Sequence, residues 1–206
     1  MTIKRKYHHG ALKEALVEAA LELLAEGGPA NLSLGEAAKR VGVTAAAPYR
    51  HFASREDLLN EVARRGFLSF GSALEKAWDE GRPEAAAAMW RMCAAYLAFA
   101  REEPGLYAAM FGSAATLASE PSADAADHAL DILWRSVVAF LQQRGVAAQG
   151  ARKLALQLWA LAHGVAMLTI SGHLDAAKGL DPIPVLDAAA RNLMESAARR
   201  AETSSV

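Results

Sequence analysis

A glycine turn inside residues 34–52, LGEAAKRVGVTAAAPYRHF, constrains the fold more than any other feature of the chain. The segment predicts two short helices, Leu34–Val41 and a second from about Ala45 to Phe52. Gly42 follows the first helix, where a departing chain adopts a positive φ that glycine takes at little cost. Two helices joined by so short a turn are typical of a helix-turn-helix unit, whose second helix enters the major groove of DNA.

Capping residues stand at the start of both predicted helices. Ser33 precedes the first helix and Glu36 follows three residues later, which is the spacing of a capping box. Thr44 is placed to cap the second helix. The local sequence therefore supports the two-helix interpretation independently of the glycine turn.

The second helix presents small residues first and polar residues afterwards. Ala45, Ala46 and Ala47 let the backbone approach the bases, and an alanine methyl can touch a thymine methyl. The proline at position 48 falls in or just after the first turn, where a missing amide matters least. A buried helical hairpin is the alternative, but it does not explain why Tyr-Arg-His follows, three potential phosphate donors.

Bulk composition excludes several other classes of protein. The 206 residues are 53% hydrophobic and 22% charged with a net charge of −1, so a nucleic-acid partner must be argued from local charge. The single cysteine, Cys93, excludes an internal disulfide and fits a reducing cytoplasm. No run of ~20 uninterrupted apolar residues stands in the sequence, so no membrane span is expected.

Catalytic motifs are missing from the sequence as well. It contains no phosphate-binding loop, no dinucleotide glycine pattern and no nucleophile elbow, and its histidines lack metal-ligand spacing. We therefore expect no enzyme activity, no cofactor and no metal site.

Helical periodicity continues through the rest of the chain and predicts an all-α fold. A second capping signature, Ser54 to Asp57, opens a long helix that reaches about Trp78. The other predicted helices span 11–26, 84–102, 106–117, 124–144, 149–171 and 185–200.

The run ALVEAALELLAEGGPANLSLGEAAKRVGVTAAAPYRHFASREDLL resembles the DNA-binding domain of the TetR family of transcriptional regulators. The similarity spans about Tyr7 to Phe67 without a gap, and YRHFASREDLL is its most specific part. It implies an N-terminal three-helix domain over residues 1–53, a linking helix over 54–80, and an effector-binding and dimerisation domain over 81–206. It also implies that long helices pair with their copies in a second subunit.

The same resemblance assigns DNA contacts residue by residue. Phosphate contacts are implied for Ser33, Thr44, Tyr49, His51 and Arg55. Base contacts are implied for Ala45, Ala46 and Pro48, with Arg50 a further candidate. A basic arm ahead of the first helix, including Arg5 and Lys6, either touches DNA or is a solvated terminus.

A short motif in the second half, Trp159-x-x-x-His163-Gly164, resembles the Trp/His-Gly signature of one TetR subgroup. His163 would either hydrogen-bond an effector or be a buried or interface histidine, with Gly164 permitting close helix contact. Aromatic and sulfur residues also gather in this half, where they favour a mostly apolar pocket or plain core packing. The pocket candidates are Trp90, Cys93, Tyr96, Tyr107, Met110, Trp134, His163 and Met167.

These observations predict a cytoplasmic, homodimeric repressor that binds double-stranded operator DNA and is released by a small apolar or aromatic effector. An activator of the same fold is an alternative. A helical small-molecule-binding protein or enzyme with a non-functional DNA module is another, and an architectural DNA-binding protein without an effector is a third.

Overall fold

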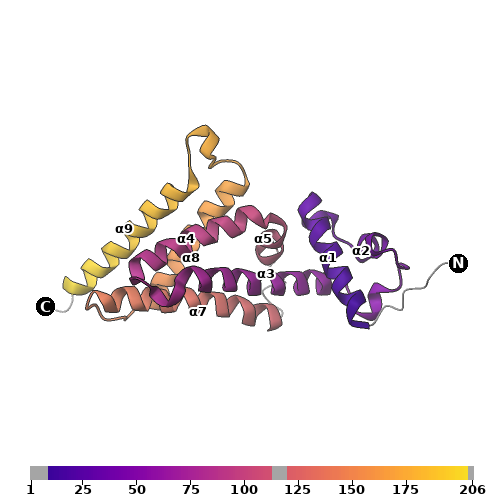
Figure 1. Cartoon of the computed structure of the whole chain (residues 1–206), viewed down its shortest axis with the longest axis horizontal. Coiled ribbons are helices and arrows are strands. Elements are labelled where there is room, and N and C mark those ends of the chain that lie inside the picture. The colour runs from indigo at the N-terminus through magenta and orange to yellow at the C-terminus, as the bar shows by residue number, and fades with distance from the viewer. Residues whose placement is uncertain (1–8, 113–119, 204–206) are drawn as a thin grey trace. The chain divides into compact units, whose positions relative to one another are not determined.

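Helices make up all the regular structure of residues 9–112 and 120–203, which the computed structural model describes (Figure 1). The predicted all-α fold is confirmed, since no strand occurs in these two ranges. The α-helices are α1 (His9–Gly27), α2 (Leu34–Val41), α3 (Arg55–Trp78), α4 (Ala85–Glu102), α5 (Pro104–Phe111), α7 (Glu120–Gln143), α8 (Ala151–Ile170) and α9 (Pro182–Thr203). Short 3-10 turns are η1 (Pro29–Asn31), η2 (Pro48–Arg50), η3 (Asp79–Gly81) and η4 (Ala176–Lys178).

The chain divides into two compact units. The first contains residues 1–67 and 103–124, and the second contains 68–102 and 125–206. This division falls inside α3 and inside α7, and it groups α5 with the N-terminal helices. The boundaries expected from the sequence, after residues 53 and 80, divide the chain differently.

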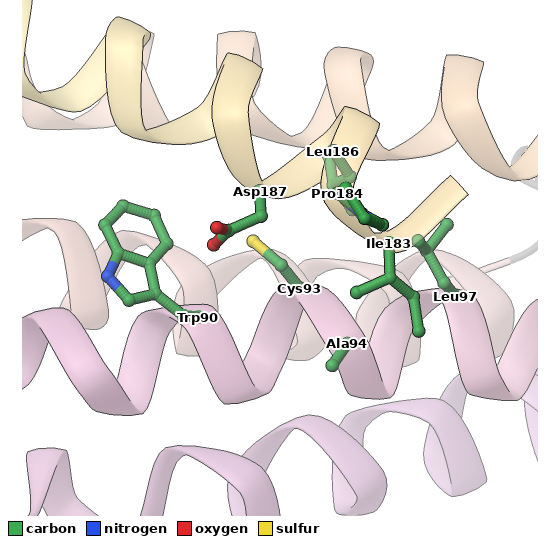
Figure 2. A pocket seen from close by; sticks show the side chains of 8 residues that line it. All are labelled: Trp90, Cys93, Ala94, Leu97, Ile183, Pro184, Leu186 and Asp187. Carbon is green, nitrogen blue, oxygen red and sulfur yellow. The ribbon is translucent and has the colours of Figure 1, made fainter. Parts of the chain in front are cut away.

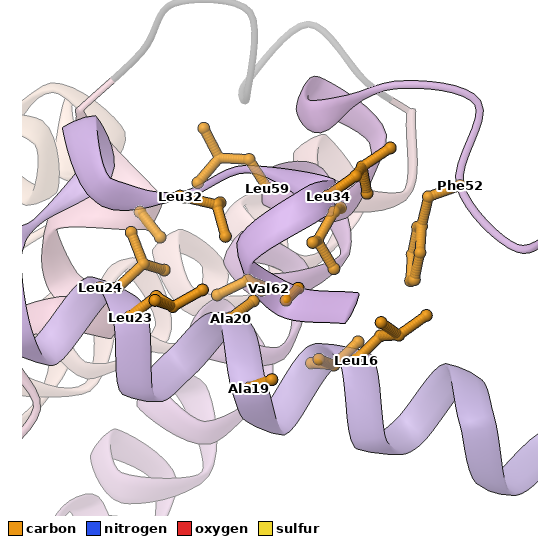
Figure 3. Packing of buried hydrophobic residues seen from close by; sticks show 14 of the residues in the cluster. Leu16, Ala19, Ala20, Leu23, Leu24, Leu32, Leu34, Phe52, Leu59 and Val62 are labelled. Atoms are coloured by element: carbon orange, nitrogen blue, oxygen red, sulfur yellow. The ribbon is translucent and has the colours of Figure 1, made fainter. Parts of the chain in front are cut away.

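One apolar face of α1 organises the core of the first unit (Figure 3). Leu16, Ala20 and Leu24 recur every four residues and are almost fully buried. Phe52, which follows the 3-10 turn η2, and Val62 of α3 are buried in the same cluster. Full burial of a leucine or phenylalanine side chain stabilises a fold by about 1.5–3 kcal/mol, so this face holds the two-helix unit in place.

Arginine–glutamate pairs connect the same helices at the surface. Arg40 of α2 binds Glu26 of α1 with both ends of its guanidinium, Nη1 to Oε1 at 2.7 Å and Nη2 to Oε2 at 2.6 Å. Arg65 of α3 binds Glu14 of α1, with Nη1 2.7 Å from Oε2. Because bidentate pairs fix direction as well as distance, they orient α2 and α3 on α1.

Helix α5 approaches α1 more closely than a side chain would permit. A Cβ built on Gly105 would lie 2.9 Å from the backbone nitrogen of Ala25. Further along α5, Met110 fills the space beside Gly66 of α3. The N-terminal helices and α5 therefore share one packed core.

The second unit is built on α4, α8 and α9, which pack against one another (Figure 1). The indole Nε1 of Trp159 on α8 donates to the hydroxyl of Tyr96 on α4 across 3.1 Å. Phe70 of α3 meets the Tyr96 ring edge to face, with centroids 4.9 Å apart. The buried Tyr96 thus accepts a hydrogen bond from the half-buried Trp159, so the polar atom of each aromatic side chain has a partner.

One side of α8 remains apolar and exposed. Leu156, Met167 and Leu168 are each about 45% exposed, and a Cβ added to Gly164 would meet no atom of residues 9–112 and 120–203 within 4 Å. By length and composition alone, α8 is the one helix in the described ranges that is long and apolar enough to cross a membrane. Core helices of soluble proteins pass the same criterion.

Candidate nucleic-acid interface

The first helix of the two-helix unit begins and ends as predicted. Ser33 is extended, and its Oγ accepts the backbone N–H of Glu36 at 3.0 Å. The Glu36 carboxylate lies 3.7 Å from Lys39 Nζ. Of the two hydrogen bonds of the predicted capping box, the one from the Glu36 N–H to Ser33 is therefore present. Gly42 ends the helix with φ 77° and ψ 32°, the left-handed conformation expected from its position.

The second helix was predicted from about Ala45 to Phe52, but the structure has a turn followed by a short 3-10 helix there. The chain turns after Thr44, whose carbonyl accepts the Ala47 N–H at 2.9 Å, and continues into the 3-10 helix η2. Pro48 has no N–H to donate back to Thr44, so the i to i−4 ladder cannot start there. The segment is still helical in path, and the Phe52 N–H reaches the Pro48 carbonyl at 3.0 Å.

Exposure separates the predicted DNA contacts into two groups. The residues exposed to solvent are Thr44, Ala45, Ala46, Tyr49 and Arg50. The exposed fraction of Tyr49 is 62%. His51 and Ser33 are half-buried. Pro48 is buried, which conflicts with its predicted base contact because a buried ring cannot reach a base edge.

Arg55, predicted to contact a phosphate, makes hydrogen bonds within the chain. Its Nε donates to the Leu32 carbonyl at 2.9 Å, and its Nη2 donates to the Pro29 carbonyl. A third donor lies 3.5 Å from the Glu56 carboxylate. The guanidinium therefore holds the connection between α1 and α2, and its phosphate contact stays a prediction.

Lys13, the last cation of the basic run over residues 4–13, lies near the predicted interface. Its Nζ lies 5.8 Å from the centre of the Phe52 ring, and with His51 and Arg64 it lines a cavity of about 270 Å³. The sequence did not predict its proximity to Phe52, because this arises from the packing of α1 against the end of η2. The predicted arm residues Arg5 and Lys6 lie outside the described residues.

A separate cavity of about 210 Å³ lies between α4 and α9 in the second unit (Figure 2). Two of the predicted pocket residues, Trp90 and Cys93, line it. Burial, and secondarily the charge of Asp187, raises the pKa of the Cys93 thiol to about 12. The thiol is therefore protonated at neutral pH and serves as a small apolar wall.

The other six predicted pocket residues do not line this cavity. Tyr107 and Met110 belong to the first unit and are buried there, with Tyr107 packed on Phe111. Trp134 and Met167 are exposed, at 38% and 46%. Helical spacing showed which residues share a helix but not which helices face one another, so the sequence could not separate these four from the residues that line the cavity.

The remaining two, Tyr96 and His163, accompany the Trp159 motif. Tyr96 is buried and takes the hydrogen bond from Trp159. His163 is half-buried on α8, and burial lowers the pKa of its imidazole. Within the described ranges no three His, Cys, Asp or Glu side chains are grouped as metal ligands.

Comparison with known proteins gives consistent results for both halves of the chain. The family model for bacterial regulatory proteins of the tetR family matches residues 16–62, and the model for the tetracyclin repressor-like C-terminal domain matches residues 89–193. An uncharacterized HTH-type transcriptional regulator of Mycobacterium tuberculosis is 29% identical over 163 residues, covering 79% of this chain and 72% of the relative.

Solved structures agree with these matches. A protein of unknown function from Rhodococcus sp. RHA1 has a TM-score of 0.79 and 31% identity, covering 94% of this chain and 98% of that one. A TetR family regulator from Thermus thermophilus has a TM-score of 0.66 at 18% identity, with coverage of 87% and 97%, and shares the fold.

Proposed function

Because the chain belongs to the TetR family of DNA-binding transcriptional regulators, we propose that it acts as a homodimeric, cytoplasmic repressor released from its operator by a small effector. The observation that carries the proposal is the exposed face after the Gly42 turn. Ala45 and Ala46 offer small side chains to base edges, and Tyr49 offers a hydroxyl to the phosphate backbone.

The rest of the first unit supports this assignment by holding that face in one orientation. Arg40 fixes α2 on α1, Arg55 fixes the connection before α2, and Phe52 anchors the end of η2 in the core. A recognition segment of only a few residues needs such bracing, since it has little helical stability of its own.

The exposed side of α8 supports dimerisation. Its leucine and methionine side chains border Gly164, where no neighbour among the described residues explains the missing side chain. A second copy packed on this face would bury them. Two reading heads spaced by about 34–36 Å would engage successive major grooves and multiply specificity.

Release would arise by a population shift. An effector that binds the second unit more tightly in a DNA-incompetent state favours that state by the ratio of its two affinities. Helix α3 contributes residues to both units, so a change along it alters the separation of the reading heads in the dimer. A small change in separation is sufficient, because both half-sites must be bound together.

Selection of bound fragments from genomic DNA tests the proposal directly. We expect a palindromic site bound by the dimer with an affinity that falls steeply between 50 and 200 mM salt, as about six or more phosphate contacts require. Transcription from the adjoining promoter should rise when the gene for this protein is deleted. A fall in transcription would instead assign an activator role, and no salt-dependent binding at any site would exclude a DNA-binding function.

A further inference from the structure

The cavity between α4 and α9 combines apolar walls with one charged side chain (Figure 2). Asp187 is the only ionisable residue besides Cys93 among the eight that line it. The apolar walls come from Trp90, Ala94, Leu97, Ile183, Pro184 and Leu186. Such a composition favours a ligand that is mostly apolar and carries one polar group at a defined position.

The Asp187 carboxylate projects from α9 toward α4, between the Trp90 ring and the Cys93 sulfur (Figure 2). Its Oδ2 accepts a hydrogen bond from Arg191 Nε at 2.9 Å, one turn further along α9. The negative charge of Asp187 also reaches Cys93, where it helps to raise the pKa of the thiol. The carboxylate therefore acts on the cavity and not only on the surface.

Arg191 shows which kind of group this site accepts. Its guanidinium carbon lies 4.4 Å from the centre of the Trp90 ring while its Nε binds Asp187. A cation is thus held between a carboxylate and an aromatic face, two groups that both attract positive charge. The side chains of Arg191 and Asp187 are 49% and 38% exposed, and an exposed pair one turn apart on a helix is weak. A competing cation can replace the guanidinium at little cost.

We propose that this cavity binds a small molecule with a flat apolar body and a protonated amine, which pairs with Asp187 and displaces Arg191 from Trp90. The volume of about 210 Å³ limits the ligand to on the order of ten non-hydrogen atoms. The proposal names the chemical class of the effector and in that respect rests on the proposed function. Binding to the cavity is measured without DNA, so the two proposals fail separately.

Titration calorimetry on the full chain at pH 7 tests the proposal with three probes of one shape. Phenylpropylamine carries a cation, phenylpropanol is neutral and phenylpropanoate carries an anion. We expect the amine to bind at least tenfold more tightly than the alcohol, and the carboxylate to bind more weakly than the alcohol.

Two substitutions on α9 assign the preference to its residues. Asp187→Asn keeps the shape of the side chain, and it should lower amine affinity at least tenfold while leaving alcohol affinity within twofold. Arg191→Gln removes the internal competitor and should raise amine affinity at least threefold. The matched control is Glu195→Gln. Glu195 lies on the same helix but pairs with Arg144 outside the cavity, so its substitution should leave the affinities for all three probes unchanged.

Other results overturn the proposal. Equal affinities for the amine and the alcohol, or an amine affinity unchanged in Asp187→Asn, remove the cation-binding role of Asp187. If the carboxylate binds most tightly, the cavity is an anion site. If none of the three probes binds, the cavity has no ligand function. Operator binding, measured in parallel by gel shift, tests the regulatory function independently of these outcomes.

Discussion

Arg55, the first residue of α3, donates through Nε to the backbone carbonyl of Leu32, 23 residues earlier in the chain, at 2.9 Å. The same guanidinium binds the carbonyl of Pro29. Both carbonyls lie in the segment that leads from α1 to Ser33, the residue that caps α2. One side chain thus holds the segment that leads into α2.

We expect Arg55→Gln to lower the free energy of unfolding by about 1–3 kcal/mol, because the two carbonyls lose a charged donor. Urea denaturation followed by circular dichroism measures this. Arg50→Gln serves as the control, since Arg50 is exposed on the reading face and should affect DNA affinity without changing stability. If Arg55→Gln unfolds at the wild-type urea concentration yet binds DNA poorly, Arg55 contacts phosphate after all.

The double substitution Tyr49→Ala with His51→Ala should weaken binding to operator and to unrelated DNA by a similar factor, at least about threefold. The reason is that phosphate contacts carry no sequence information. Fluorescence anisotropy with both DNAs measures the two affinities. Tyr49→Phe, which removes only the hydroxyl, should give part of the loss, whereas wild-type affinity in the double variant would separate both residues from DNA.

Gly164→Leu should shift the protein from dimer to monomer without loss of helix content. A side chain at this position meets open space within the chain, but would hold a partner's helix away from α8. Sedimentation at several concentrations measures the dimer dissociation constant. Gly35→Leu is the matched control, because Gly35 is also exposed but lies on α2. An unchanged dissociation constant in Gly164→Leu would place the interface elsewhere.

Glu61 should make the stability of the first unit depend on pH. Hydrogen bonds from Arg64, and then from Arg65, outweigh burial and lower the pKa of its carboxyl to about 2. The folded-state pKa lies below the unfolded value, so the stabilisation is present at neutral pH and is lost as pH falls from about 4.5 toward 2. Allowing for solvent screening, we expect about 1–2 kcal/mol.

Urea unfolding of wild type and Glu61→Gln between pH 7 and pH 2.5 measures this contribution. The variant should be less stable at pH 7 and should approach the wild type at the acid end. Glu75→Gln removes the partner of Arg135 in an exposed pair and should have little effect at any pH. A constant stability difference between wild type and Glu61→Gln would show that the charge of Glu61 is not the cause.

Local sequence was sufficient for the features that depend on neighbouring residues. The apolar face of α1 follows from the helical spacing of its buried residues. The Ser33 cap follows from a hydroxyl that can accept a backbone N–H. The Gly42 turn follows from the lack of a Cβ, which permits a positive φ. Ser54 likewise accepts the Asp57 N–H at 3.1 Å, as its spacing predicted. Each of these involves residues no more than four positions apart.

Features that depend on distant contacts could not be predicted in the same way. The hydrogen bonds of Arg55 within the chain were not predicted, because the carbonyls that accept them are more than 20 residues away. Tyr107 and Trp134 have the composition of pocket residues, but one is buried in the first unit and the other is exposed. The sequence placed Pro48 in or just after the first turn of the segment. Whether the segment forms an α-helix or a 3-10 helix depends on how far the helix extends on either side of Pro48.

The exposure of Ala45 and Ala46 has a consequence for how the DNA preference of this protein evolves. Neither methyl contributes to the buried cluster, and both are exposed on the reading face. Under the proposed function, larger or polar residues at these two positions would leave the scaffold intact while presenting new chemistry to the bases. Preference for a new DNA sequence is therefore accessible through one or two codon changes, without compensating mutations in the interior.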